Sequence, residues 1–598
     1  MRYVKKNLPN RIAYILSLCL VYLTCNGNTP TTPIGLEQAY LQLAQALTAQ
    51  NQQTEALTYY KKTIEQNPHN QEALYQLGTT FFKKNEYTEA VSYLEQYAAL
   101  NNTNIEVLNQ LHTAYAALVN REKSIYYQQQ VIALQPTELG YLQLGNLFLQ
   151  QGNFPKAIES YNNVLTINPK NSQAYLNKAQ TLEKNSHIQE AIDVYDQLLA
   201  LYKNHPQSLL GKAALLVKRG DTEAALSLYQ QLQPYIPAQK KASLLYAMGT
   251  AHRKGGRLTQ AQELFQTILN QNPNYTHAIL GLAKTKLTLG QYPLGWQLMA
   301  HYNQLANPHE ARLLTNRSHI KGKKIFIGAE WILEDMVQLV RYAKTIHDEG
   351  GSVIMQTPPQ LEALFKACPF IDKVVGFNEN LSPAYHAYIP ITSLPALFQT
   401  TMETIPNTLP YLLPPQDLVT HWHNLLKHDS NFKVGICWKK NEQQVYDPAE
   451  RTSIPFSLFA PLAKIPGLSV YCLQQVTEQE SVAFSYHDLI TLCGKGFNED
   501  NDGLIELAAL MKNLDLIITL DCCVAHVAGA LGTHVWTLLP TRADYRWLAG
   551  RLDYPWYPTM RLFRQKDTGD WKSVLNCVIK EVTLLLQTDK KASHEKNL

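Results

Sequence analysis

An acidic residue at the end of an apolar run, followed by two cysteines and a histidine, is the pattern in this sequence best suited to chemistry. Residues 514–521 read LDLIITLD, a continuous apolar strand that ends at Asp521, and Cys522, Cys523 and His526 follow at the start of a predicted helix. Open α/β sheets bind ligands at the carboxyl ends of their strands. The first turn of a helix offers free N–H groups and a positive dipole end to a diphosphate, and Asp521 is its expected N-cap. We therefore expect these residues to line an anion site.

The same residues leave other chemistries open. Cys522 and His526 are four residues apart, so they share a helix face and could bind a metal ion, but no fourth donor is evident nearby. A cysteine at a helix N-terminus could also act as a nucleophile. We favour cysteine as a small substitute for serine or threonine, and we predict neither a metal ion nor a cofactor. A purely structural role for His526 remains an alternative.

Strands alternating with helices must position this site. The predicted strands are KKIFIGA (323–329), GSVIMQT (351–357), KVVGF (373–377), KVGICW (433–438), LSVYCLQ (468–474), LDLIITLD (514–521) and HVWTLLP (534–540). Buried apolar strands separated by helices indicate parallel sheets. A proline-rich bridge, Pro406 to Pro415, separates the third strand from the fourth. We predict two Rossmann-like lobes, residues 316–415 and 430–590, with a cleft between them.

The first half of the chain repeats itself with a period of about 34 residues. A small residue, a bulky residue four positions later and a proline twelve positions later recur together in most units, as at Ala157, Tyr161 and Pro169. The small residue lets two helices approach, the bulky residue fills the groove between them, and proline ends the second helix. We predict helices throughout residues 35–305, as seven units and a degenerate eighth near residues 281–296.

This repeat resembles the tetratricopeptide repeat (TPR). Such units cannot bury their apolar faces alone, so they stack into an α-solenoid whose concave face binds proteins or peptides. The resemblance implies a TPR superhelix that holds a protein or peptide partner. Gln128 replaces the bulky residue in the third unit, and Asn102 and Lys203 replace prolines.

Composition excludes one class of partner. The 598 residues carry a net charge of only +4, with 45% hydrophobic and 17% charged residues. This balance is typical of a folded protein and argues against nucleic acid as the main partner. The short basic runs, including Lys439–Lys440, are interpreted as ordinary solvated lysines beside strands.

The N-terminus and the cysteines point to different compartments. Basic residues precede an apolar run at residues 12–24, which predicts a signal peptide or N-terminal anchor within residues 1–30 and attachment to a membrane through that run. Nine cysteines occur, none in a CxxC pair, which favours buried free thiols in a reducing compartment. A bacterial cytoplasm and a membrane-anchored location therefore both stay open.

The second half resembles a class of bacterial TPR-linked glycosyltransferases, similar to heptosyltransferases and more distantly to the O-linked N-acetylglucosamine transferases. The similarity spans residues 323–571. It rests on the segment DCCVAHVAGALG (521–532), SLP (393–395), TIPNTLPYL (404–412), SIP (453–455), LQ (473–474), DYRWLAGRLDYPWYPTMRLFRQ (544–565) and Trp571. The resemblance implies a glycosyltransferase-B-like fold and metal-independent, inverting transfer of a hexosyl or heptosyl group. The donor is a nucleotide sugar, and the acceptor is a protein or glycan presented by the TPR array.

The resemblance also assigns site residues. Asp335 stands where relatives carry the catalytic base, although it could instead N-cap a helix beginning at Met336. The nucleotide sugar is expected to meet Asp521, Cys522, Cys523, His526, Arg451 and Gln474. Arg451, or a lysine such as Lys439, would offset the charge of the leaving group.

Two departures from the family pattern support a second hypothesis. ILED (332–335) replaces a glycine-rich loop, and Cys522 replaces a hydroxyl residue. Glycines allow a backbone to approach a ligand closely, whereas Ile332 and Glu334 do not. The alternative function is therefore a non-catalytic TPR scaffold with a degenerate transferase domain.

Overall fold

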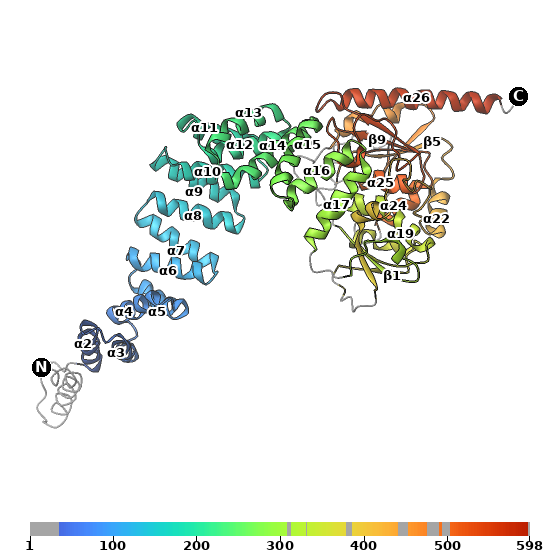
Figure 1. Ribbon diagram of the computed structural model, residues 1–598. Helices are drawn as coiled ribbons and strands as arrows, with labels where there is room; N and C mark the ends of the chain where they lie inside the picture. The colour runs from blue at the N-terminus through green and yellow to red at the C-terminus, as the bar shows by residue number, and fades with distance from the viewer. Residues whose placement is uncertain are drawn as a thin grey trace, which may run out of the picture. The chain divides into compact units, whose positions relative to one another are not determined.

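The computed structural model describes residues 35–307, 312–330, 332–377, 379, 385–440, 453–474, 490–492 and 503–595 (Figure 1). The chain divides into two compact units, with the boundary after Lys212. The predicted signal or anchor at residues 1–30 lies outside the described residues. In the part of the chain that is described, no helix is long and apolar enough to cross a membrane.

From residue 35 to residue 307 the described chain forms helices and no strand, as the 34-residue period predicts. The α-helices are α2 (Leu36–Ala49), α3 (Gln53–Gln66), α4 (Gln71–Lys83), α5 (Tyr87–Leu100), α6 (Ile105–Ala117), α7 (Arg121–Leu134), α8 (Glu138–Gln151), α9 (Phe154–Ile167), α10 (Ser172–Lys184), α11 (Ile188–Leu201), α12 (Pro206–Arg219), α13 (Thr222–Leu232), α14 (Lys241–Lys254), α15 (Leu258–Gln271), α16 (Thr276–Thr288) and α17 (Tyr292–Ala306). Consecutive helices pack in pairs, among them α2 with α3, α8 with α9 and α16 with α17. The predicted degenerate eighth unit is thus a complete helical hairpin.

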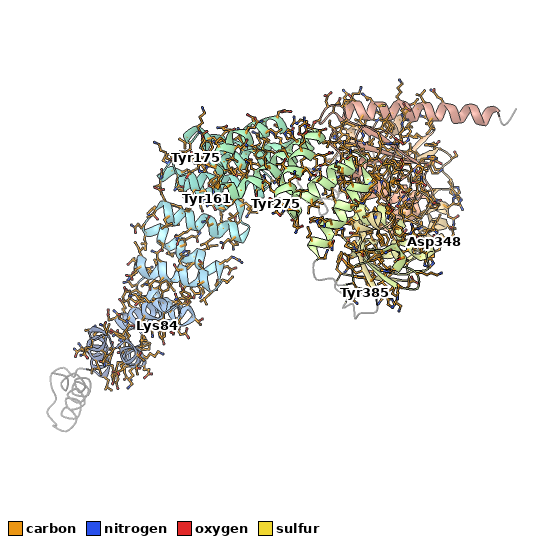
Figure 2. The ribbon with its side chains drawn as sticks, in the orientation of Figure 1. Lys84, Tyr161, Tyr175, Tyr275, Asp348 and Tyr385 are labelled. Carbon is orange, nitrogen blue, oxygen red and sulfur yellow. The ribbon has the colours of Figure 1, made fainter. Side chains whose placement is uncertain are left out.

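Close packing inside each hairpin explains the repeat pattern. Tyr161 of α9 is fully buried, and its ring lies where a Cβ on Gly145 of α8 would be 2.5 Å from it (Figure 2). Only glycine leaves room for the ring at this approach. The same relation joins Gly249 to Phe265 and Gly78 to Leu94. The recurring small and bulky residues therefore encode contacts between neighbouring helices.

Two parallel sheets follow, both in the second unit. The first has the order β3-β2-β1-β4 and the second the order β10-β9-β8-β5-β6-β7, with every strand pair parallel. The strands are β1 (Lys324–Gly328), β2 (Ser352–Gln356), β3 (Lys373–Val375), β4 (Ala387–Pro390), β5 (Phe432–Cys437), β6 (Leu468–Cys472), β7 (Ile490–Leu492), β8 (Leu516–Leu520), β9 (Val535–Leu539) and β10 (Met560–Arg564).

In each sheet the strand order reverses beside the strand that comes first in sequence, β1 in the first sheet and β5 in the second. β1 lies between β2 and β4, and β5 lies between β6 and β8, so the connections leave the two strands in opposite directions. At such a switch point the loops at the carboxyl ends of the strands diverge and leave a crevice for a ligand. The switch points fall after β1 and β4 in the first sheet, and after β5 and β8 in the second.

Helices bring the two switch points together. The helical segments that matter for the site are α18 (Leu333–Leu339), α19 (Arg341–Asp348), α20 (Pro359–Lys366), η4 (Ile391–Ser393), α21 (Leu394–Leu397), α24 (Gly503–Met511), α25 (Cys523–Ala530), η9 (Tyr545–Trp547) and α26 (Trp571–Glu595). α18, which follows β1, packs against α25, which follows β8. The last repeat hairpin touches both halves, because α17 packs on η4 and α21 while α16 packs on η9.

Candidate functional site

The carboxyl end of the second sheet holds a buried ion pair. Lys440 follows β5, and its Nζ lies 3.3 Å from Oδ2 of Asp521, which follows β8; the two side chains are 17% and 8% exposed. Burial opposes the charged carboxylate, but Lys440 and the nearby Arg546 outweigh it and hold the pKa of Asp521 below its usual range. Two predictions are corrected here. Lys440 is not a solvated lysine, and Asp521 does not cap the following helix.

The cap of that helix is Cys522, because α25 begins at Cys523 and has no side-chain cap. The Asp521 carboxylate is turned to Lys440 instead. Cys522 Sγ lies 3.9 Å from Cys437 Sγ and 3.4 Å from Thr519 Oγ1. The bond to Cys522, with burial, holds the pKa of the Cys437 thiol well above its usual range.

The remaining predicted residues of the helix are deeply buried. Burial, reinforced by Glu334, raises the pKa of Cys523 well above its ordinary value, so this thiol is neutral near pH 7. His526 has no exposed surface, and the centroid of its ring lies 4.9 Å from that of Trp547, with the two rings tilted by 42°. Burial and neighbouring cations lower the pKa of His526 far below its usual value. A neutral imidazole offers no charge to a phosphate, so His526 could serve a ligand only through a hydrogen bond.

Gln474 supports the loop that carries Lys440. The backbone N–H groups of Trp438 and Lys439 donate to Gln474 Oε1 at 2.7 and 3.0 Å. This bond pair holds the chain in place just after β5, so Gln474 shapes the switch point. The other predicted contact, Arg451, lies outside the described residues.

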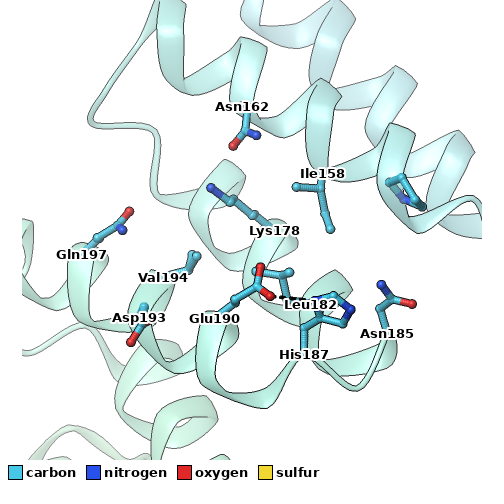
Figure 3. A pocket seen from close by; sticks show the side chains of 11 residues that line it. Ile158, Asn162, Lys178, Leu182, Asn185, His187, Glu190, Asp193, Val194 and Gln197 are labelled. Atoms are coloured by element: carbon cyan, nitrogen blue, oxygen red, sulfur yellow. Dashed lines mark hydrogen bonds and ion pairs between the residues drawn. The ribbon is translucent and has the colours of Figure 1, made fainter.

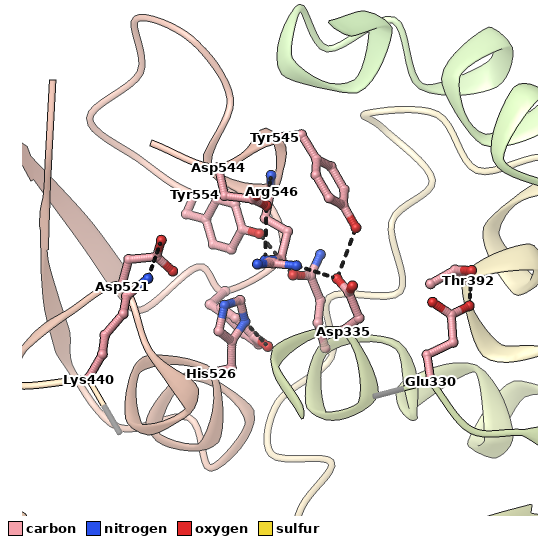
Figure 4. A network of polar contacts seen from close by, with 12 residues as sticks. Glu330, Asp335, Thr392, Lys440, Asp521, His526, Asp544, Tyr545, Arg546 and Tyr554 are labelled. Atoms are coloured by element: carbon pink, nitrogen blue, oxygen red, sulfur yellow. Dashed lines mark hydrogen bonds and ion pairs between the residues drawn. The ribbon is translucent and has the colours of Figure 1, made fainter. Parts of the chain in front are cut away.

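Asp335 forms an ion pair that links the two halves of the second unit (Figure 4). Its Oδ1 accepts from Arg546 Nη1 at 2.8 Å and from the Tyr545 hydroxyl at 3.0 Å. The Asp335 and Arg546 side chains are 5% and 10% exposed. Asp335 does not cap α18, whose N-cap is Ile332. Its carboxylate faces residues of the second half and is engaged there in an ion pair.

Glu330 is a half-buried residue with a carboxyl that the sequence interpretation missed. It follows β1, and its Oε1 accepts from the Thr392 hydroxyl of η4 (Figure 4). Burial, then the charge of Asp335, raises the pKa of Glu330 to about 7. Asn303 of α17 donates to Thr392 Oγ1 at 2.8 Å, which joins the last repeat helix to this carboxyl. Its position directly after a buried strand was the only sequence signal.

Four buried polar atoms in this network lack a hydrogen-bond partner of normal geometry among the described residues. They are Oδ1 of Asp521, Nε2 of His526, Nε of Arg546 and Nε1 of Trp547, and the indole of Trp547 also helps to lower the pKa of Asp521. Buried polar atoms are almost always paired, so these atoms are free to bond a polar ligand. One acceptor and one ring nitrogen that can donate or accept suit a hydroxylated or phosphorylated molecule.

A separate groove lies among the repeat helices of the first unit. It encloses about 470 Å³ between α9, α10 and α11 (Figure 3). Ile158, Leu182 and Val194 give it an apolar wall, and Lys178 projects into it. Burial lowers the pKa of Lys178, while Glu190 opposes that change. Glu190 is itself bonded to His187 at 2.8 Å.

Models of known repeat families match the first half of the chain. TPR models match residues 47–115, 145–186, 176–240 and 243–275. The chain contains TPR repeats. Among curated proteins, Protein FlbA of Caulobacter vibrioides is 30% identical over 217 residues, which cover 36% of this chain and 34% of the relative. The matched part is thus about a third of that relative's length.

Several solved structures align with parts of the chain. The crystal structure of MamA protein is 24% identical, covers 28% of this chain and 93% of its own, and has a TM-score of 0.24. The C-terminal part of a TPR repeat-containing protein from Cytophaga hutchinsonii is 19% identical, with coverages of 40% and 99% and a TM-score of 0.33. YrrB, described as a TPR protein with an unusual peptide-binding site, is 14% identical, with coverages of 31% and 95% and a TM-score of 0.27.

Proposed function

We propose that this chain is a protein-interaction scaffold whose TPR helices hold a peptide or protein partner. The observation that carries the proposal is the groove between α9, α10 and α11, which combines an apolar wall with a partly buried lysine. Stacked helical repeats present extended surfaces of this kind to partners. An apolar wall with a few polar groups gives a bound side chain both affinity and orientation.

A photo-crosslinking amino acid placed in the groove tests this proposal. We expect the full-length chain with a benzophenone side chain at Asn162, an exposed residue that lines the groove, to give a discrete crosslinked species in cells. The same group at Glu159, which is exposed but does not line the groove, is the matched control. Ile158→Arg should reduce the Asn162 crosslink by about tenfold, because it places a charge on the apolar wall.

Equal crosslinking from both positions, or none from Asn162, would show that this groove does not hold the partner. An Asn162 crosslink that survives Ile158→Arg would also count against the groove. Unfolding of the variant is checked by circular dichroism, since the repeats are helical.

A second function, transfer of a sugar from a nucleotide sugar, is favoured by a specific observation. The switch point of the second sheet carries a half-buried lysine, Lys440, beside Asp521, whose Oδ1 has no hydrogen bond of normal geometry among the described residues. A lysine there can balance a diphosphate, and the orphaned oxygen can accept from a ribose or sugar hydroxyl. On this proposal the TPR helices present the acceptor, and the two parallel sheets form the halves of a glycosyltransferase-B-like domain.

Calorimetric titration of the full chain with UDP, GDP and their sugar conjugates tests the nucleotide site. We expect Lys440→Ala to weaken nucleotide binding at least tenfold, about 1.4 kcal/mol, because it removes the cation at the switch point. Lys433→Ala is the control, since Lys433 lies at the opposite end of β5. Failure of all these compounds to bind the wild type would leave the scaffold as the function.

A further inference from the structure

The switch point of the first sheet holds a carboxyl in a fixed orientation. Asn303 Nδ2 donates to the hydroxyl oxygens of Thr392 and Ser393, each at 2.8 Å. Because an N–H group already occupies the Thr392 oxygen as acceptor, the Thr392 hydrogen is directed to Glu330 Oε1. One carboxyl oxygen of Glu330 is thereby held in place. A carboxylate accepts at several lone-pair positions, so the group can still bind a second donor.

Asp335, the base expected from the family resemblance, is placed differently. Its Oδ1 accepts from both Arg546 and Tyr545. If Asp335 took a proton from a substrate, the Arg546 guanidinium would lose its most buried counter-ion. Among the described residues it would keep only the ion pair with Asp544, which is 27% exposed and lies 3.2 Å from Arg546 Nε. Weakening the ion pairing of a nearly buried charge is costly. The ion pair therefore suits a structural link better than a proton acceptor.

The charges around Glu330 suit proton transfer near neutral pH. Burial and then Asp335 of α18 raise the pKa of Glu330 to about 7, whereas Thr392 and Lys284 of α16 act to lower it. Tyr545 of η9, whose own pKa is raised chiefly by burial, also faces this group. A general base works best when its pKa lies close to the working pH.

We propose that Glu330 is the general base of the transfer reaction, held by Thr392 and Asn303, an inference that rests on the second proposed function. The acceptor O–H gives its proton to the Glu330 carboxylate while its oxygen forms a bond to the anomeric carbon. The bond from that carbon to the diphosphate oxygen breaks, and its electron pair leaves with the nucleoside diphosphate. Glu330 then passes the proton to water. Lys440 balances the charge of the leaving group.

Turnover of purified full-length protein tests this assignment. The probes are UDP-N-acetylglucosamine, UDP-glucose and GDP-mannose, with release of nucleoside diphosphate measured and water as the acceptor. We expect Glu330→Gln to lower the rate at least 100-fold and to leave the Kd of the donor within threefold. Glu330→Asp should keep part of the activity. Glu362→Gln, at a partly exposed carboxylate paired with Lys366, should change nothing.

A second measurement does not depend on turnover. The raised pKa of Glu330 means that its carboxyl stabilises the fold fully below about pH 4.5 and that this contribution is lost as pH rises through about 7. Glu330→Gln should therefore become more stable relative to wild type as pH increases from 4.5 to 7, and the difference should level off above pH 7. The wild-type rate should rise over the upper part of this range.

The outcomes separate the base from the transferase itself. Turnover by the wild type that Glu330→Gln retains would overturn the assignment and leave the transferase proposal standing. Loss of turnover in Asp335→Asn, with donor binding and stability intact and Glu330→Gln active, would return the role to Asp335. A stability difference that does not vary with pH would also overturn it. A wild type that binds none of the three donors would remove both proposals.

Discussion

Replacing Arg546 with alanine should lower the free energy of unfolding of the second unit by about 3–5 kcal/mol, because it leaves the buried Asp335 carboxylate without its cation. Tyr545 would still donate to Asp335, but a hydroxyl does not neutralise a charge. The loss should be large because the ion pair joins the segment after β1 to the segment after β9. Loss of the Asp335–Arg546 ion pair should therefore favour separation of the two halves of the second unit.

Tryptophan fluorescence during urea unfolding measures this effect in the intact chain. All eight tryptophans lie at or after Trp296, so the signal reports the second unit. Arg551→Ala is the matched control, since it breaks the exposed ion pair with Asp553 and should cost less than about 1 kcal/mol. Asp335→Asn added to Arg546→Ala should recover part of the loss. A single Arg546→Ala variant within about 1 kcal/mol of wild type would show that the pair does not join the halves.

Replacing Trp556 with alanine should lower the same free energy by about 3–5 kcal/mol, the usual loss for a fully buried tryptophan. Its side chain is 1% exposed, and its Nε1 donates to the Tyr292 hydroxyl of α17 at 2.8 Å. The ring also lies 6.2 Å from that of Trp296 and 6.4 Å from that of Tyr342 of α19. Trp556 thus joins the last repeat helix to both halves of the sheet region.

Two milder variants separate the contribution of the Trp556 hydrogen bond to the free energy of unfolding from the contribution of its ring packing. Tyr292→Phe removes only the hydrogen bond and should cost about 1 kcal/mol. Trp556→Phe keeps most of the apolar volume and should fall between the two. Urea unfolding followed by the remaining tryptophans measures all three variants. If Trp556→Ala cost no more than Tyr292→Phe, packing of the ring would not be what holds the last hairpin to the sheets.

The repeats were predictable from sequence because their contacts are local. Gly145 and Tyr161 belong to neighbouring helices of one hairpin, so a fixed spacing in sequence corresponds to a fixed contact in space. The parallel strands were also predictable where they are continuous and apolar, as at β8. Three strands were not: β7 has only three residues, β4 contains Pro390, and β10 carries Arg561 and Arg564.

The partners of the site residues were not predictable, because they come from distant parts of the chain. Asp335 and Arg546 are 211 residues apart, and Lys440 and Asp521 are 81 apart. No local pattern encodes such pairs. Asp521 is an example. Its local sequence predicts that it caps the following helix, but in the folded chain its carboxylate pairs with Lys440, which is distant in sequence.

By itself the sequence therefore determined the TPR helices, the continuous apolar strands and the position of Asp521 at a strand end, all of which follow from periodicity and short-range packing. Only the tertiary structure decided that Asp335 closes onto Arg546 and that Glu330 is held by Thr392 and Asn303. The physical reason is that a carboxylate's charge partner and burial depend on which loops the folded sheets bring together, and loops far apart in sequence meet only after the chain has folded.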